Sequence, residues 1–117
     1  MDGIHEGHRA RMKKKLLENG ERSLADHELL EVLLYYAIPR RDTNELAHRL
    51  LKQFGSLRGV LSAPVQELAC VSGVGQQAAL LMGMVPMLCR RAAQREKEQI
   101  LNSVDACGAY FTELLGS

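Results

Sequence analysis

Hydrophobic residues recur every three or four positions along most of the chain, which is the spacing that puts side chains on one face of an α-helix. The first such series runs from Ile4 to Leu16 at four-residue intervals, and Gly20 follows it. No segment alternates between hydrophobic and polar residues for long enough to form a strand, so the chain is expected to be all-α. The pattern predicts helices over residues 5–18 and 27–37, and a third from the cap at 42 to the glycine at 55. Shorter helices are predicted from 56 to 61 and from 64 to about 70. A long helix is predicted from 76 onward, and a last one after 103.

Polar residues, proline and glycine mark the ends of these helices. Asp26 is expected to cap the second helix, and Pro39 stops it. Asp42 with Glu45 three residues later is typical of a capping box, and Gly55 closes the helix that this pair opens. These local signals agree with the hydrophobic spacing and predict one compact helical domain.

The composition narrows the class of protein. With 117 residues, 46% hydrophobic content, no tryptophan and two phenylalanines, the chain predicts a single core of Leu, Ala, Val and Met. No hydrophobic run is long enough to span a bilayer and the N-terminus is charged, which predicts a cytoplasmic protein with no membrane partner. Cys70, Cys89 and Cys107 lack the spacing of metal ligands, so reduced, mostly buried thiols and no metal or cofactor are expected.

A glycine-containing turn at residues 71–75, Val-Ser-Gly-Val-Gly, separates two predicted helices. Glycine adopts the positive φ angles that a short turn between helices requires, and the amides at the start of the second helix stay open to a ligand. Such amides suit phosphate because the helix dipole is positive there. The segment resembles the helix-hairpin-helix motif of DNA-processing proteins, here over about residues 64–85, although the turn could instead simply join two packed helices. The predicted nucleic-acid-binding residues of this motif are Ser72, Gly73, Val74, Gly75, Gln76 and Gln77.

Positive charge is unevenly distributed although the net charge is only +1. Five basic residues and one acidic residue lie from His5 to Lys15, and further basic groups occur at 40–41 and 90–95. Surface lysines and arginines are often only solvated, and that alternative stays open for each group. The basic residues predicted to support phosphate binding are Arg9, Arg11, Lys13, Arg40 and Arg41.

The chain also contains a weak internal repeat. Residues 38–42 lie between two predicted helices as residues 71–75 do, with Ala47 placed roughly as Ala79 is, but without the glycines. Two such hairpins would form a pseudo-two-fold pair with a degenerate first copy, and would present both turns to one duplex. Turns that point to opposite faces would exclude this arrangement.

Three further motifs, in the same order along the chain, resemble the N-terminal region of the RadC family (UPF0758). They are His5-Glu6-Gly7-His8-Arg9-Ala10-Arg11, Leu24-Ala25-Asp26-His27-Glu28-Leu29-Leu30 and Pro39-Arg40-Arg41-Asp42-Thr43, followed by Phe54-Gly55-Ser56-Leu57 and the glycine turn. The resemblance covers nearly all of residues 4–115. It implies a helical N-terminal domain of a bacterial protein named for DNA repair, joined to a C-terminal JAB/MPN-type metalloprotease-like domain with a zinc site. On this basis we expect residues 1–99 to be the RadC-like domain and residues 100–117 to be a connector helix toward that second domain.

No set of residues predicts catalysis, so the chain is expected not to be an enzyme. The His-x-His pattern of the family's second domain does not occur in it. His5 and His8 could share a helix face, but a third ligand is missing nearby, so packing against the domain is their expected role. Glu28 and Glu31 follow His27 without the second histidine of a zinc-protease helix, and we expect them to be polar decoration on a buried helix.

Two functions are compatible with these features. The first is a non-enzymatic DNA-binding module that contacts the phosphate backbone without reading sequence. Gln76 and Gln77 stand where many DNA-binding hairpins carry a cation, so weak binding is expected. The second is a protein-interaction or regulatory module that positions the metalloprotease-like domain, or self-associates, without binding DNA.

A hydrophobic surface would serve the second function. The residues that could form it are Leu33, Tyr35, Tyr36, Met82, Met84 and Met87, although methionines at such spacing more often fill a core. Convergence of the basic groups and the glycine turn on one face would favour DNA. A covered turn beside an open hydrophobic patch would favour a protein partner.

Overall fold

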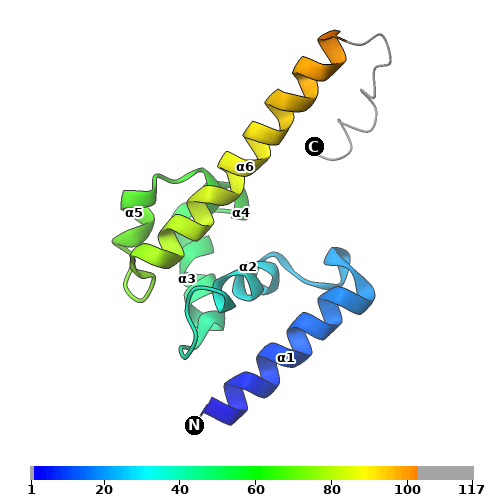
Figure 1. The fold of residues 1–117 in the computed structure, drawn as a ribbon. Coiled ribbons are helices and arrows are strands. Elements are labelled where there is room, and N and C mark those ends of the chain that lie inside the picture. The colour runs from blue at the N-terminus through cyan, green and yellow to red at the C-terminus, as the bar shows by residue number, and fades with distance from the viewer. Residues whose placement is uncertain (1, 103–117) are drawn as a thin grey trace. The chain divides into compact units, whose positions relative to one another are not determined.

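Residues 2–102 are described by a computed structural model, with side chains described from residue 6 to residue 99. The helices in this range are α1 (Asp2–Asn19), the 3-10 helix η1 (Glu21–Ser23), α2 (Asp26–Tyr35), α3 (Thr43–Phe54), α4 (Leu57–Ser62), α5 (Val65–Ala69) and α6 (Gly75–Asn102) (Figure 1). No strand occurs within residues 2–102, which confirms the all-α prediction. The helix predicted after residue 103, and with it nearly all of the predicted connector at 100–117, lies outside the described residues.

The chain divides into two compact units, Met1–Gly83 and Met84–Ser117, and the boundary between them falls within α6. The first unit holds α1 to α5 and the beginning of α6. The described part of the second unit is the rest of α6, which continues through Pro86 without interruption. None of the helices described is long and hydrophobic enough to cross a membrane.

Side-chain caps begin α3 and α4, and the cap of α3 is the predicted Asp42. Asp42 Oδ1 accepts hydrogen bonds from the amides of Asn44 (3.0 Å) and Glu45 (3.4 Å). Ser56 Oγ accepts one from the amide of Gly59 at 2.9 Å. Both caps satisfy amides that have no acceptor within their own helix.

The start of α2 differs from the prediction. Asp26 is the first residue of the helix rather than its cap, and Ala25 occupies the cap position in an extended conformation. The Ala25 amide donates to Glu28 Oε1 at 2.8 Å, so Glu28 supplies the carboxylate that we expected from Asp26.

The hydrophobic core of the first unit is centred on α2 and α3, which pack against each other. The leucines of the two helices lie in one cluster, as their spacing predicts: Leu30, Leu34, Leu46 and Leu50. The same cluster includes residues of α4, α5, the glycine turn and α6, namely Val60, Leu68, Val71, Val74, Ala78, Ala79 and Met82. A second cluster joins α1 to α2 through Met12, Leu24, Val32 and Tyr35. The turn at 71–75 is therefore part of the core and not a loop laid over it.

The expectation of buried cysteines is wrong for both thiols in the described range. Cys70 is exposed because it follows the last residue of the short helix α5. Cys89 is exposed because it lies within residues 87–92 of α6, all of which are exposed. Cys107 lies outside the described residues.

The predicted hydrophobic contact surface is divided between core and exterior. Tyr35 and Met82 are buried in the two clusters, so they are not available to a partner. Tyr36, Met84 and Met87 are exposed. The helical period explains the division, because residues one or two positions apart, such as Tyr35 and Tyr36 or Met82 and Met84, face different sides of a helix.

The close approach of α5 and α6 depends on Gly83. A β-carbon added there would lie 2.5 Å from Cγ2 of Val65, a branched side chain with few alternative rotamers. We expect Gly83→Ala to lower the free energy of unfolding by about 1–2 kcal/mol in a urea titration, although alanine is otherwise favoured in helices. The control is the same substitution in a Val65→Ala background, where it should cost less. An equal cost in both backgrounds would contradict this account of the packing.

Candidate nucleic-acid interface

The glycine turn joins α5 to α6 through two residues with positive φ. Gly73 has φ 90° and Gly75 has φ 74°. Residues other than glycine rarely adopt this region of φ. Between them, Val74 turns inward and is only 4% exposed, and Val71 at the start of the turn is also buried. The Val74 amide donates to the carbonyl of Val71 at 3.1 Å, which closes the turn. Ser72 and Gly75 remain exposed.

The open hydrogen-bond donors of the turn lie at the start of α6. The first amides of a helix have no acceptor within it, and in α6 these include the amides of Gly75, Gln76 and Gln77. All three residues are exposed. We had also expected the Val74 amide to face a ligand, but it is already bonded to Val71 within the turn. The donors available to an anion are therefore displaced toward the helix.

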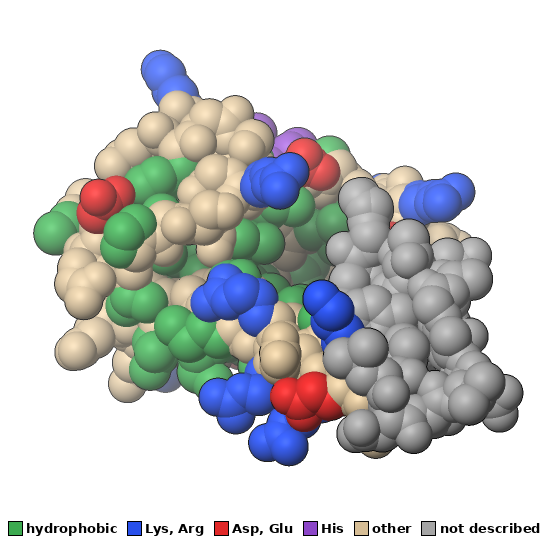
Figure 2. All heavy atoms as spheres, turned by 90° about the horizontal axis from the view of Figure 1, so that it is seen from above, with side chains coloured by type: hydrophobic (Ala, Val, Ile, Leu, Met, Phe, Trp, Pro, Cys, Tyr) green, Lys and Arg blue, Asp and Glu red, His purple; other side chains and the backbone are tan. Residues whose placement is uncertain are grey.

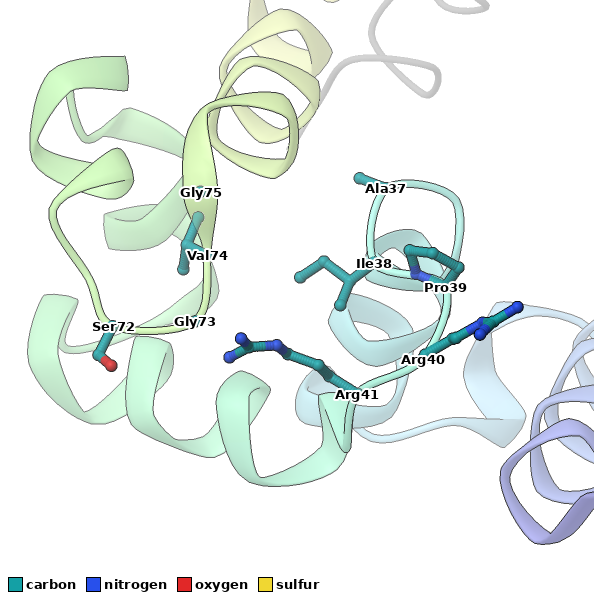
Figure 3. Close-up of a pocket in the computed structure, with 9 residues that line it drawn as sticks. All are labelled: Ala37, Ile38, Pro39, Arg40, Arg41, Ser72, Gly73, Val74 and Gly75. Carbon is teal, nitrogen blue, oxygen red and sulfur yellow. The ribbon is translucent and has the colours of Figure 1, made fainter. Parts of the chain in front are cut away.

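A hollow of about 560 Å³ separates this turn from the loop between α2 and α3. The loop side is formed by residues 37–41 and the turn side by residues 72–75. Arg41 points across the hollow toward the glycine turn, whereas Arg40 points away from it (Figure 3). The two neighbouring arginines that the sequence could not distinguish are thus directed to different surfaces.

Arg49 of α3, which was not among the predicted binding residues, also reaches the turn. Its Nη2 atom donates to the carbonyl of Ser72 at 3.0 Å, and its Nε atom lies 3.6 Å from Glu45 Oε1. A second hollow, of about 330 Å³, is lined by Arg41, Asp42, Glu45, Leu46, Arg49 and Gly73. Arg49 follows the cap residue Asp42 by seven positions, which is about two helical turns. The helical period alone therefore places Arg49 on the same face of α3 as Asp42.

The guanidinium groups of Arg41 and Arg49 both lie close to Gly73. A β-carbon built on Gly73 would lie 3.4 Å from Nη2 of Arg49 and 3.5 Å from Nη1 of Arg41. The absent side chain leaves the backbone of the turn open between two cations. Such an arrangement can bind an anion by charge and by hydrogen bonds at once.

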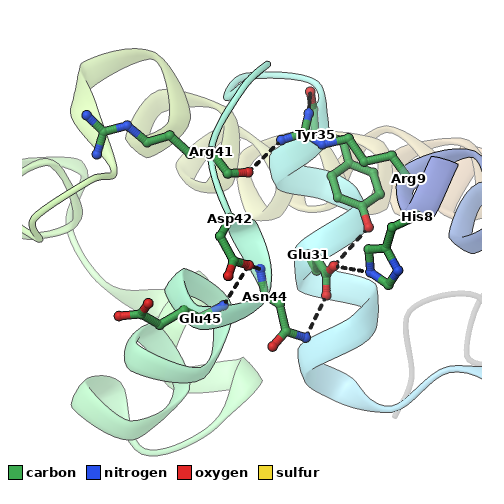
Figure 4. Close-up of polar contacts among 8 residues, drawn as sticks. All are labelled: His8, Arg9, Glu31, Tyr35, Arg41, Asp42, Asn44 and Glu45. Carbon is green, nitrogen blue, oxygen red and sulfur yellow. Dashed lines mark hydrogen bonds and ion pairs between the residues drawn. The ribbon is translucent and has the colours of Figure 1, made fainter. Parts of the chain in front are cut away.

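A buried polar network lies behind the Arg41 loop, centred on Glu31, which is 1% exposed (Figure 4). His8 Nε2 lies 2.9 Å from Glu31 Oε1, the Tyr35 hydroxyl donates to the same oxygen at 2.9 Å, and Asn44 Nδ2 donates to Glu31 Oε2 at 3.0 Å. Burial, followed by the hydrogen bond to Glu31, raises the pKa of the Tyr35 hydroxyl well above its usual value. Tyr35 therefore remains a hydrogen-bond donor at neutral pH.

This network changes the interpretation of two predicted residues. Glu31 is not polar decoration, because three donors from α1, α2 and α3 converge on its carboxylate. His8 packs against the domain as expected, and the side chain of His5 lies outside those described. No group of three or more His, Cys, Asp or Glu residues that could hold a metal ion lies in the described part of the chain.

Arg9 is a buried residue, 9% exposed, although the sequence presented it as a surface cation. It donates from Nη2 to the carbonyl of Arg41 at 3.0 Å and from Nη1 to that of Tyr35 at 3.4 Å. Its Cζ atom lies 4.6 Å from the centroid of the Tyr35 ring. Arg9 thus ties α1 to the loop that carries Arg41.

The remaining predicted cations, Arg11 and Lys13, line neither of the two hollows. Arg11 is exposed on α1, and Lys13 is half-buried with its Nζ atom 5.8 Å from the centroid of the Tyr36 ring. On the face shown in Figure 2, Lys and Arg side chains stand singly or in small groups among hydrophobic and uncharged surface. The positive charge on this face is therefore divided among separate small groups, in keeping with a net charge of +1.

The two turns that suggested an internal repeat line the same hollow. Residues 38–41 and residues 72–75 face each other across it. The opposite orientation, which would have excluded a pair of hairpins, is not found. A pseudo-two-fold origin of the two turns stays a prediction.

Known proteins resemble this chain over the segment that holds both turns. The sequence model of the UPF0758 N-terminal family matches residues 5–80. A curated UPF0758 protein of Ruegeria pomeroyi is 38% identical over 101 residues, which make up 85% of this chain and 45% of that protein. The chain thus spans less than half the length of this relative. No solved structure matches the chain.

Proposed function

We propose that this chain, which belongs to the UPF0758 family through its N-terminal domain, is a non-enzymatic module that binds the sugar-phosphate backbone of DNA. The match to the UPF0758 N-terminal family confirms the family that the motifs predict. The proposal assigns phosphate binding to the glycine turn and the arginines beside it. From the resemblance to the RadC family, we also propose that the domain acts in DNA repair in the bacterial cytoplasm, next to a metalloprotease-like domain.

The observation that carries the proposal is the approach of two arginines to Gly73. Arg41 reaches it from the loop between α2 and α3, and Arg49 reaches it from α3. Cations beside the open amides at the start of α6 offer both charge and hydrogen-bond donors to one phosphate. Ser72 and Gly75 of the turn are exposed, so part of its backbone is accessible to a ligand.

Arg9 has a positioning role in this proposal. Its buried guanidinium donates to the carbonyl of Arg41, so it fixes the loop that presents the Arg41 side chain. The surface cations Arg11, Lys13 and Arg40 add weaker, longer-range attraction. Gln76 and Gln77 add hydrogen-bond donors without charge.

The affinity should be low and should depend on salt. Two arginines and a helix start make few phosphate contacts, and each contact releases about one counterion. We therefore expect sequence-independent dissociation constants in the nonspecific range of roughly 10⁻⁴ to 10⁻⁶ M, weakening as salt rises.

The test is a charge substitution at the turn. Arg41→Gln should weaken binding to a short fluorescent duplex by about 3- to 10-fold at low salt and reduce the slope of log affinity against log salt by about one. The physical reason is the loss of one phosphate contact. Fluorescence anisotropy at several salt concentrations measures both quantities.

Arg58→Gln is the matched control, because Arg58 is exposed on α4 and the substitution removes the same charge. It should leave the salt slope nearly unchanged. Equal losses in the two variants would mean that only the total charge matters. Absence of binding by the unmodified chain at low salt would refute DNA binding as the function.

A second candidate function rests on exposed hydrophobic residues of the second unit. Met84, Met87 and Leu88 are 41%, 46% and 62% exposed, and their spacing places them on one side of α6. Such a surface suits a protein-interaction or regulatory module, including one that positions a metalloprotease-like domain. Binding of DNA by the Arg58→Gln variant but not by an Arg41→Gln, Arg49→Gln variant would favour the first function over this one.

A further inference from the structure

Tyr36 is an exposed aromatic residue next to the candidate interface. It is 70% exposed, whereas its neighbour Tyr35 is 8% exposed. Tyr36 occupies the C-cap of α2, with its amide donating to the Leu33 carbonyl at 3.2 Å. Its backbone is therefore held by the helix while its ring projects into solvent. No role in the core or in the Glu31 network accounts for a tyrosine at this position.

One cation lies close to the Tyr36 ring. The Nζ atom of Lys13 lies over the ring, 5.8 Å from its centroid. The loop that begins at the next residue, Ala37, carries Arg40 and Arg41. An exposed aromatic ring with cations on neighbouring segments is a combination that proteins use to hold single-stranded nucleic acid, with bases stacked on rings and phosphates on cations.

The Tyr36 ring is also within reach of a DNA strand bound at the glycine turn. Arg41 follows Tyr36 by five positions, so their α-carbons are at most about 18 Å apart. Arg41 itself faces the glycine turn across the hollow. A strand of several nucleotides can extend from one to the other, since the binding sites of single-strand-binding folds cover about 4–16 nucleotides.

We propose that Tyr36 is a stacking platform for an unpaired base of a DNA strand whose phosphates are held by the glycine turn and Arg41. This inference rests on the proposed function and adds the substrate class, which is DNA with single-stranded character. Bases within a duplex already stack on one another and cannot cover the ring. The platform therefore favours single strands, gaps or junctions over intact duplex.

The first test compares variants of Tyr36 on two ligands, a twelve-nucleotide thymidine strand and a fully paired hairpin duplex. Tyr36→Ala should weaken single-strand binding by roughly 5- to 100-fold, the effect of losing one stacked base, and change duplex binding by less than about twofold. Tyr36→Phe keeps the ring and should bind like the unmodified chain. Because Tyr36 is exposed, both variants should keep the helical circular-dichroism spectrum.

The second test is spectroscopic. The chain has no tryptophan, so Tyr36→Trp introduces a single indole at the platform. Stacking of a base should quench its fluorescence as the thymidine strand is added. Gln66→Trp is the control, because Gln66 is exposed on α5 and no stacking is expected there.

The outcomes separate this inference from the proposed function. Duplex binding that depends on Arg41, with no preference for the single strand and no effect of Tyr36→Ala, would overturn the platform and leave phosphate binding intact. Equal losses on both ligands, or equal quenching at positions 36 and 66, would also overturn it. Failure of the unmodified chain to bind either ligand would overturn both proposals.

Discussion

Replacement of Glu31 by alanine should lower the free energy of unfolding by about 3 kcal/mol, which is a large share of the stability of a domain of this size. The carboxylate is 1% exposed and accepts from Tyr35 and Asn44, with His8 Nε2 also within 2.9 Å. Its removal leaves the buried Tyr35 hydroxyl without an acceptor and opens a polar cavity between α1, α2 and α3. Urea titration followed by circular dichroism measures the loss, and the melting temperature should fall by roughly ten degrees.

Glu18→Ala is the matched control, because Glu18 is exposed on α1 and the substitution removes the same atoms. It should change the free energy of unfolding by less than about 0.5 kcal/mol. Tyr35→Phe removes the donor that Glu31 Oε1 accepts from, so Glu31→Ala should cost less in that background. A Glu31→Ala variant as stable as Glu18→Ala would show that the network does not hold these helices together.

A similar loss, of about 3 kcal/mol, is expected from Gly59→Ala, a substitution that usually stabilises a helix. A β-carbon at Gly59 would collide with the carbonyl oxygen of Phe54, a backbone atom at the end of α3 that no rotamer change can move aside. The same residue donates its amide to Ser56 Oγ, so the cap of α4 would be displaced as well. Thermal and urea unfolding of the variant measure the effect.

Gly55→Ala distinguishes collision from backbone strain. Gly55 has φ 88° at the end of α3, but a β-carbon there meets nothing within 4 Å. Its replacement should cost about 1–2 kcal/mol, from the positive φ alone. If Gly59→Ala proved less costly than Gly55→Ala, the contact with Phe54 would not be a constraint on this fold.

The helices and most of their ends could be predicted from the sequence because their causes are local. The cap by Asp42, the left-handed Gly55 and the cap by Ser56 each depend on residues within one turn of the helix. The leucine spacing of α2 and α3 likewise requires only that one face be buried. Asp26 shows the limit of this approach, since the helix begins one residue earlier than expected, with Ala25 at the cap position and Asp26 as its first residue.

The candidate site was only partly predictable because its parts come from distant segments. The glycine turn and Arg41 could be recognised from sequence, but the bond of Arg49 to the Ser72 carbonyl spans 23 residues. Arg9 could not be separated from its exposed basic neighbours, because its burial depends on the ring of Tyr35 and the carbonyl of Arg41. Glu31 looked like a surface residue for the same reason, since its partners lie on three helices.

The inward position of Val74 has a consequence for the thermodynamics of ligand binding. The residue between the two glycines is anchored in the core, so folding has already fixed the conformation of the turn. A flexible loop would lose conformational entropy on binding, at about 0.5–1.5 kcal/mol for each side chain that is immobilised, and this preorganised turn avoids much of that cost. A few contacts can therefore suffice for measurable affinity, and the rigidity that permits this also restricts the turn to ligands that fit its existing shape.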